Sequence, residues 1–294
     1  MQAININNLT KDYGNNKGIF DLSLSVDKGE VYGFLGPNGA GKTTTIRNLL
    51  GFIKPQAGSC LINNADCWKN SASIKKDLGY LPGEIAFMDN MTGMQMIEFV
   101  ASMKGIKDLS KAKELIERFE LNPIGKIKKM SKGMKQKIGI VCAFMNNPEV
   151  IILDEPSSGL DPLMQNVFIN LILEEKNKGK TIFMSSHIFE EVERTCDRTA
   201  IIKDGRIISI EDMKSLKSKK SKSYIITFSS AESLEKFKNK QFDITGIDDN
   251  TVTVRVKDNL PVLLKELSEL DIKDLDIKTQ TLEELFLHFY GGEK

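Results

Sequence analysis

One glycine-rich segment, GPNGAGKT at residues 36–43, constrains the fold of this chain more than any other feature. It fits the pattern G-x-x-x-x-G-K-[ST], with the apolar strand VYGFLG before it and the helical stretch GKTTTIRNLLG after it. Its glycines let backbone N–H groups turn inward around an anion, and the following helix aims its positive end at that anion. Lys42 adds a charge for the β- and γ-phosphates, and Thr43 offers a hydroxyl to Mg²⁺. The segment predicts a nucleoside-triphosphate site rather than a plain strand-to-helix turn.

A phosphate loop of this kind requires an acidic residue after a second buried strand, to hold the metal and its water. The segment VIILDEP at residues 150–156 provides it. We expect Asp154 to serve Mg²⁺ and Glu155 to polarise an attacking water. A helix cap is the other interpretation of an Asp-Glu pair, and both Pro156 and the phosphate loop disfavour it.

The order of the predicted elements favours an α/β fold over about residues 1–210. Thr92 and Gln95 form a capping box, and Asp161 with Pro162 forms an N-cap followed by a first-turn proline. Short buried strands that alternate with such helices indicate a mainly parallel sheet. The predicted strands cover residues 2–9, 19–26, 31–36, 59–62, 78–81, 150–153, 181–184 and 198–203.

The composition changes at DMKSLKSKKSKS, residues 212–223. We therefore divide the chain into a nucleotide-binding domain at 1–211, a linker at 212–222, helical at its start, and an accessory domain at 223–294. The last region predicts the order β-α-β-β-α-β of a ferredoxin-like unit. Its final helix, TLEELFLHFY, begins with Thr281 and Glu284 as a capping box.

Composition excludes several other classes of protein. The chain has 294 residues and a net charge of +1, which gives no overall attraction to nucleic acid or to an anionic membrane. Its four Cys form no CxxC pair and are expected to be small buried residues, and two His are too few for a multi-His metal site. We expect no signal peptide, and no apolar stretch reaches the ~20 residues that span a bilayer.

A further segment, MSKGMKQK at residues 130–137, can be interpreted only from its position relative to the other motifs. It precedes VIILDEP, and SSGLDP follows at 157–162, then His187 after TIFMSS. Together with Tyr13 in LTKDYG and with GYLPGE at 79–84, this order resembles the ATP-binding cassette (ABC) family. The chain looks most like the cytoplasmic ATP-binding subunit of a bacterial ABC transporter of the exporter branch, which handles drugs, antimicrobial peptides or ions.

The resemblance implies a P-loop fold with a mainly parallel core sheet, an antiparallel β subdomain and a helical subdomain. It also implies a head-to-tail dimer, in which the loop of one subunit and Ser131 and Gly133 of the other enclose ATP. Tyr13 would stack on adenine, Asp161 would line the dimer seam, Glu155 would act as general base, and His187 would contact the γ-phosphate and the water. The implied loop contacts are Gly36, Pro37, Asn38, Gly39, Ala40, Gly41, Lys42, Thr43 and Thr44.

Two positions depart from the family pattern. The signature Leu-Ser-Gly-Gly-Gln reads Met-Ser-Lys-Gly-Met here, so Lys132 either adds charge near the phosphates or points into solvent. The family's Q-loop glutamine is replaced by Gly83, with Glu84 next. Either Glu84 joins Thr43 and Asp154 as a Mg²⁺ ligand, or water fills that place.

The expected function is ATP hydrolysis that powers a separate membrane permease, from the inner face of the cell membrane and with a second identical or related ATPase subunit. The region between GYLPGE and the signature, including FMDNMTGMQMIEFV at residues 87–100, would be the docking surface. The alternative is a soluble, non-transport ABC ATPase of a macromolecular assembly. A nucleic-acid-binding role is disfavoured because the lysine runs lack interleaved aromatic residues. The C-terminal unit would support the dimer, regulate it, or only stabilise the chain.

Overall fold

The computed structural model describes residues 1–219, 222–256, 260–279, 281 and 284. Its contacts divide the chain into two compact units, Met1–Met213 and Lys214–Lys294. Met213 is buried, and its backbone N–H donates to the carbonyl of Asp197, so the first unit extends to this residue.

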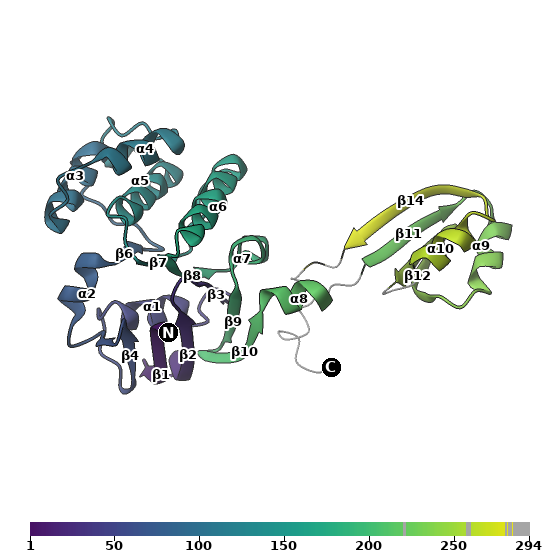
Figure 1. Ribbon diagram of the computed structural model, residues 1–294, viewed down its shortest axis with the longest axis horizontal. Helices are drawn as coiled ribbons and strands as arrows, with labels where there is room; N and C mark the ends of the chain where they lie inside the picture. Colours follow the sequence, from purple (N-terminus) through teal and green to yellow (C-terminus); the bar gives the residue numbers. More distant parts are fainter. Residues whose placement is uncertain (220–221, 257–259, 280, 282–283, 285–294) are drawn as a thin grey trace. The chain divides into compact units, whose positions relative to one another are not determined.

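The first unit is built on a six-stranded sheet with the order β10-β9-β3-β8-β7-β6 (Figure 1). All neighbouring strands are parallel except β10, which pairs with β9 in the antiparallel sense. Every residue of β3, β7 and β8 is buried, as expected for strands covered on both faces. The strands are β3 (Val31–Leu35), β6 (Gly79–Leu81), β7 (Val150–Asp154), β8 (Thr181–Ser186), β9 (Arg198–Lys203) and β10 (Arg206–Asp212).

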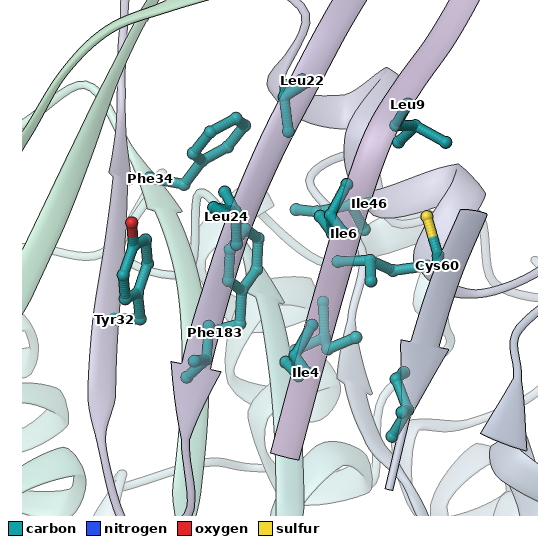
Figure 2. Close-up of a cluster of buried hydrophobic side chains, with 14 of the residues drawn as sticks. Ile4, Ile6, Leu9, Leu22, Leu24, Tyr32, Phe34, Ile46, Cys60 and Phe183 are labelled. Atoms are coloured by element: carbon teal, nitrogen blue, oxygen red, sulfur yellow. The ribbon is translucent and has the colours of Figure 1, made fainter. Parts of the chain in front are cut away.

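A second, antiparallel sheet with the order β2-β1-β4-β5 faces the first. Its strands are β1 (Gln2–Asp12), β2 (Gly18–Asp27), β4 (Ala57–Ile62) and β5 (Ala65–Asp66). Figure 2 shows Ile4, Ile6 and Leu24 of this sheet beside Phe34 and Phe183 of the other, with Ile46 of helix α1 (Lys42–Leu49) among them. Burial of each such side chain contributes roughly 1.5–3 kcal/mol, so this core fixes the start of α1 against both sheets.

Helices α3, α4 and α5 pack together as a separate layer of the first unit (Figure 1). The capping box of Thr92 and Gln95 at the start of α3 is present as predicted. On α5 the predicted apolar face is buried through Ile138, Val141 and Cys142. The remaining helical elements of this unit are α2 (Ser71–Asp77), α3 (Gly93–Lys104), α4 (Ser110–Arg118), η1 (Ile127–Lys129), α5 (Lys132–Phe144), α6 (Pro162–Asn177) and α7 (Phe189–Thr195).

The second unit has the predicted β-α-β-β-α-β order. Its sheet is antiparallel throughout, with the strand order β12-β13-β11-β14, so the first and third strands lie in the middle. Tyr224, Ile226 and Phe228 of β11 point toward one core with Phe237 of α9. Helix α8 (Met213–Lys219) begins at the last residue of the first unit and precedes this order. The elements of the order are β11 (Lys222–Phe228), α9 (Ala231–Lys238), β12 (Asp243–Asp248), β13 (Thr251–Val256), α10 (Leu260–Leu267) and β14 (Ile272–Thr279).

The predicted final helix lies outside the described residues except at its start. There Thr281 and Glu284 make both reciprocal hydrogen bonds of the predicted capping box, each of 3.1 Å. All four Cys are free and buried, as expected from their apolar neighbours. Within the described part of the chain, no helix is long and apolar enough to cross a membrane.

Candidate active site

The glycine-rich loop between β3 and α1 depends on glycine at defined positions. Gly39 and Gly41 have φ values of +83° and +111°, which disfavour any side chain. A Cβ on Gly36 would lie 2.5 Å from the carbonyl oxygen of Ile202, so the loop passes directly over β9. Helix α1 has no side-chain cap and no acidic residue in its first turn. Its N-terminal N–H groups therefore suit an anionic ligand.

Lys42 is held inside this loop, with only 5% of its surface exposed. Its Nζ donates to the carbonyl oxygens of Gly36 (2.7 Å) and Pro37 (3.2 Å), and it lies 3.2 Å from Oε1 of Glu155. The ammonium group is thus fixed at the centre of the loop. A phosphate group in the loop would meet a positioned positive charge.

The two carboxylates predicted after β7 have different partners. Asp154 is buried and accepts hydrogen bonds from Thr43 (2.9 Å) and Ser185. Glu155 lies between two groups, with Oε1 toward Lys42 and Oε2 3.5 Å from Nδ1 of His187. The arrangement separates a buried acid beside the Thr43 hydroxyl from a partly exposed acid beside a histidine.

The backbone at Glu155 is left-handed, with a φ of +48°. Its N–H donates to both the carbonyl and the hydroxyl oxygen of Ser185, each at 3.1 Å. This conformation is costly for a residue other than glycine and needs such support. It turns the chain sharply at the end of β7, where the Glu155 side chain meets Lys42 and His187.

A pocket of about 580 Å³ opens beside these groups. A Cβ on Gly83 would lie 3.2 Å from Oδ2 of Asp154, so the segment in the predicted Q-loop position passes close to this acid, and Glu84 follows on the exposed side. Tyr80 also faces the pocket, and its pKa is raised to about 12, first by burial and then by the charge of Asp154. The pocket is lined by Asn38, Thr43, Arg47, Phe52, Tyr80, Pro82, Gly83, Glu84, Asp154 and Glu155.

The donor set fits Mg²⁺ bound mainly by a nucleotide. Thr43 and Asp154 offer hard oxygen ligands side by side. Among the described residues no three His, Cys, Asp or Glu side chains gather into a metal cage. Magnesium is commonly held by one or two protein oxygens together with phosphates and water, and Thr43 with Asp154 matches that pattern.

The signature segment contacts a different part of the chain, the loop at residues 155–161. Ser131 is the N-cap of α5, and its Oγ accepts from the N–H of Met134 at 3.2 Å. Lys132 donates to Oγ of Ser158 at 2.7 Å, so its side chain lies along this loop. A Cβ on Gly133 would lie 2.5 Å from the carbonyl oxygen of Gly159. The segment and the loop are thus in direct backbone contact.

Two further predicted residues lie away from the pocket. Asp161 is the N-cap of α6, since its Oδ1 accepts from the N–H of Met164 at 3.0 Å, with Pro162 in the first turn. Tyr13 follows β1 and is 54% exposed, with Nζ of Lys11 5.8 Å from the centre of its ring. One chain therefore brings Lys42, Asp154 and Glu155 together, while the signature residues gather on a second surface.

Sequence reasoning missed two residues of this region. Ser185 supports Asp154 through its hydroxyl and Glu155 through its backbone. Glu191 on α7 is buried next to the His187 loop. Ser185 had a signal, a polar residue at the end of an apolar strand, but three acidic residues in FEEVE made Glu191 resemble part of a solvated face.

Comparisons with known proteins agree with the geometry. A family model described as ABC transporter matches residues 19–158. The bacitracin transport ATP-binding protein BcrA of Bacillus licheniformis is 34% identical, over 98% of this chain and 97% of the relative. The linearmycin resistance ATP-binding protein LnrL of Bacillus subtilis is 31% identical, over 97% of both chains.

A solved structure described as the ATP-binding subunit of an ABC transporter superposes with a TM-score of 0.68. It is 30% identical and covers 73% of this chain and 92% of its own. The matched sequence contains the phosphate loop, the signature and the strand that ends at Asp154. The chain therefore belongs to the ATP-binding proteins of ABC transporters and is the ATP-hydrolysing subunit of such a system.

Proposed function

We propose that this subunit powers a separate membrane permease of the exporter type, which it joins at the inner face of the cell membrane. The likeness to the bacitracin transport and linearmycin resistance proteins extends over 98% and 97% of the chain and so includes the C-terminal unit. Both names refer to antimicrobial compounds. We therefore assign the permease a substrate of that broad class, moved outward.

The observation that carries the proposal is the convergence of Lys42, Thr43, Asp154 and Glu155, with His187 at the edge. Lys42 binds the β- and γ-phosphates of ATP. Thr43 and Asp154 hold Mg²⁺, and Glu84, at the mouth of the same pocket, takes the place of the missing glutamine. The ion, when bound, neutralises charge on the phosphate oxygens.

Glu155 acts as the general base in the hydrolysis step. A water attacks the γ-phosphorus and gives its proton to the carboxylate, while the bond from the γ-phosphorus to the bridging oxygen breaks and ADP leaves with that electron pair. His187 lies 3.5 Å from the same carboxylate, and 46% of its side chain is exposed. It can therefore contact both the water and the γ-phosphate.

The second half of the site comes from another copy of the chain or from a related subunit. Oγ of Ser131 accepts a hydrogen bond from the backbone of α5, so its own hydrogen is free to be donated to a γ-phosphate. Gly133 adds a backbone N–H in the first turn of the same helix. Asp161 lies at the seam, and the exposed ring of Tyr13 stacks on adenine.

The permease is proposed to dock on residues 87–100. Met88 is half exposed in the loop before α3, whereas Met96 and Ile97 face the core. The exposed thioether offers an adaptable apolar contact for a permease helix. The non-transport alternative requires no such docking partner.

The Glu155→Gln variant tests the proposed function. It keeps the shape of the side chain and removes the base, so hydrolysis by the full chain should fall at least about a hundredfold. ATP binding, followed by titration calorimetry, should persist, and ATP should now produce a stable dimer in size-exclusion chromatography. Glu149→Gln, at the exposed opposite end of β7, is the matched control and should hydrolyse ATP at the parental rate.

If the Glu155→Gln variant hydrolysed ATP at the parental rate, the assignment of Glu155 as the base would be refuted. If that variant remained a monomer at saturating ATP, the proposal that two subunits share the site would be refuted. The permease is tested by co-expressing this chain with any membrane protein of about six spanning helices that is encoded next to it. Cells that express both should tolerate bacitracin, and the Glu155→Gln variant should abolish that tolerance. Failure of the two proteins to co-purify would favour the non-transport alternative.

A further inference from the structure

Glu191 is a buried acidic residue that has no role in the hydrolysis step proposed above. It lies on α7 with 4% of its surface exposed. Its Oε2 accepts a hydrogen bond of 2.6 Å from the hydroxyl of Ser186, and that hydroxyl oxygen accepts from the N–H of Ile188 at 3.0 Å. These two bonds span His187, which stands between Ser186 and Ile188. The carboxyl group therefore holds the ends of the histidine's loop.

The same carboxyl group reaches the loop that follows β7. The hydroxyl of Ser157 lies close enough to this carboxyl group to lower its pKa, and both residues line a small cavity of about 130 Å³ beside α6 and α7. Ser157 lies two residues after Glu155, so the contact joins the general-base side of the site to the histidine side. Among the described atoms Oε1 has no partner of full hydrogen-bond geometry. A proton on Oε1 would make this buried atom a donor to the hydroxyl oxygen of Ser157.

The surroundings favour the neutral form. Burial raises the pKa of Glu191 from 4.5 to about 7, and the charge of Glu155 adds to this shift, while the bonds from Ser186 and Ser157 oppose it. Hydrogen bonds hold Arg194, on the next turn of α7, to Asn166 and Glu190. The titratable or charged groups near Glu191 are Glu155, which follows β7, and Glu190, Arg194 and Cys196 on or next to α7. Helix α6 faces the same cavity with Pro162, Gln165, Asn166 and Ile169, none of which is charged.

We propose that Glu191 is a positioning residue for ATP hydrolysis, whose carboxyl group ties Ser186 to Ser157 and so fixes His187 relative to Glu155. The inference rests on the role proposed above for His187. In the neutral form the group bridges the two loops. In the ionised form it places a second negative charge near Glu155 and near an incoming γ-phosphate, which weakens the arrangement.

The test compares the full chain with Glu191→Gln, which mimics the neutral carboxyl, and Glu191→Ala, which removes the bridge. The Ala variant should lose roughly tenfold in kcat with little change in KM for ATP, since it displaces His187 without touching the nucleotide loop. The Gln variant should restore kcat to within about twofold at pH 7. Above pH 7 the parental kcat should fall relative to that of Glu191→Gln as the carboxyl ionises.

The stability of the fold provides a readout that does not depend on hydrolysis. Between pH 4.5 and about 7 the folded chain binds this proton and the unfolded chain does not. Parental stability should therefore decrease relative to that of Glu191→Gln as the pH rises through this window and run parallel above it. Thermal unfolding at several pH values measures this. Glu190→Gln, on the exposed neighbouring position, should match the parent in both profiles.

Three outcomes would overturn the inference. The first is the same pH dependence of kcat for Glu191→Gln and the parent, and the second is an unchanged kcat for Glu191→Ala despite lower thermal stability. The third, parental hydrolysis by His187→Ala, would refute the histidine's role itself and remove the basis of the inference. If His187→Ala is inactive and Glu191→Ala is fully active, only the inference about Glu191 fails.

Discussion

The two halves of the proposed ATP site are held in different ways. In the phosphate-loop half, charged groups contact one another, with Lys42 3.2 Å from Glu155 and Thr43 2.9 Å from Asp154. In the signature half, Oγ of Ser131 accepts a hydrogen bond from the backbone of its own helix, and Gly133 lies close to the backbone of Gly159. Within one chain the two halves are linked through the loop after β7, since the side chain of Gln136 on α5 donates to the carbonyl oxygens of Glu155 (3.4 Å) and Pro156 (2.7 Å).

The difference suggests a division of labour. The first half is organised around charge and can bind a nucleotide alone. The second half is a rigid surface, because α5 is anchored to the loop at 155–161 by Lys132 and Gln136. Since that loop begins at Glu155, a movement of the base would be passed to the surface that meets the other subunit. Substitutions in the first half should therefore weaken ATP binding, whereas substitutions in the second half should weaken ATP-dependent dimerisation and hydrolysis.

The largest effect is expected for Lys42→Ala, which removes the central charge of the first half. Two charge-assisted hydrogen bonds to phosphates contribute roughly 1.5–3 kcal/mol each, so ATP affinity should fall on the order of a thousandfold. Titration calorimetry with ATP measures this. The exposed Lys54→Ala is the control and should bind normally. Nearly normal binding by Lys42→Ala would show that the first half is not organised by this charge.

A smaller effect is expected for Gly133→Ala in the second half. The added Cβ would meet the carbonyl oxygen of Gly159 at 2.5 Å, and backbone must move, at a cost of about 2 kcal/mol. Hydrolysis and ATP-dependent dimerisation should weaken, while ATP binding to the monomer stays unchanged. Gly125→Ala is a matched control, because its Cβ would meet only Cε of Met130 at 3.9 Å. Equal behaviour of the two variants would contradict the close contact.

The smallest effect on stability is expected for two cap substitutions. Ser131→Ala and Ser230→Ala each remove an N-cap, of α5 and of α9, and each should cost about 1 kcal/mol in the unit that holds it. Only Ser131→Ala should also reduce hydrolysis, because only that hydroxyl is proposed to reach ATP. Chemical denaturation and an ATPase assay on the same samples separate the two contributions. Reduced hydrolysis by Ser230→Ala would assign the C-terminal unit an active role.

Much of the fold could be predicted because its signals are local. The phosphate loop, the buried strands and the capping box at Thr92 each depend on a few neighbouring residues, and so does the β-α-β-β-α-β order of the second unit. The helix at Ser110–Arg118 was not predicted, since its N-terminus has no side-chain cap. The segment predicted as a linker at 212–222 is helical at its start, as expected, through α8, but its last residue already belongs to β11.

The residues of the site could be predicted from motifs, but the contacts between distant segments of the chain could not. The motifs identified Lys42, Asp154 and Glu155, whereas the position of Lys132 against Ser158 follows from packing between distant segments. Glu191 shows the limit most clearly. Periodicity places Val192 and Thr195 on the inner side of α7, but burial of the adjacent acid depends on how α7 meets α6 and β8.

The left-handed backbone at Glu155 has a consequence for how the chain can change over generations. Glycine or asparagine would adopt this conformation at lower cost, so the position favours residues that cannot act as a base. Under the role proposed for Glu155, the substitutions Glu155→Gly and Glu155→Asn should lower the backbone strain and remove the base. A glutamate at this position therefore costs some folding stability and supplies the proposed base at the same residue.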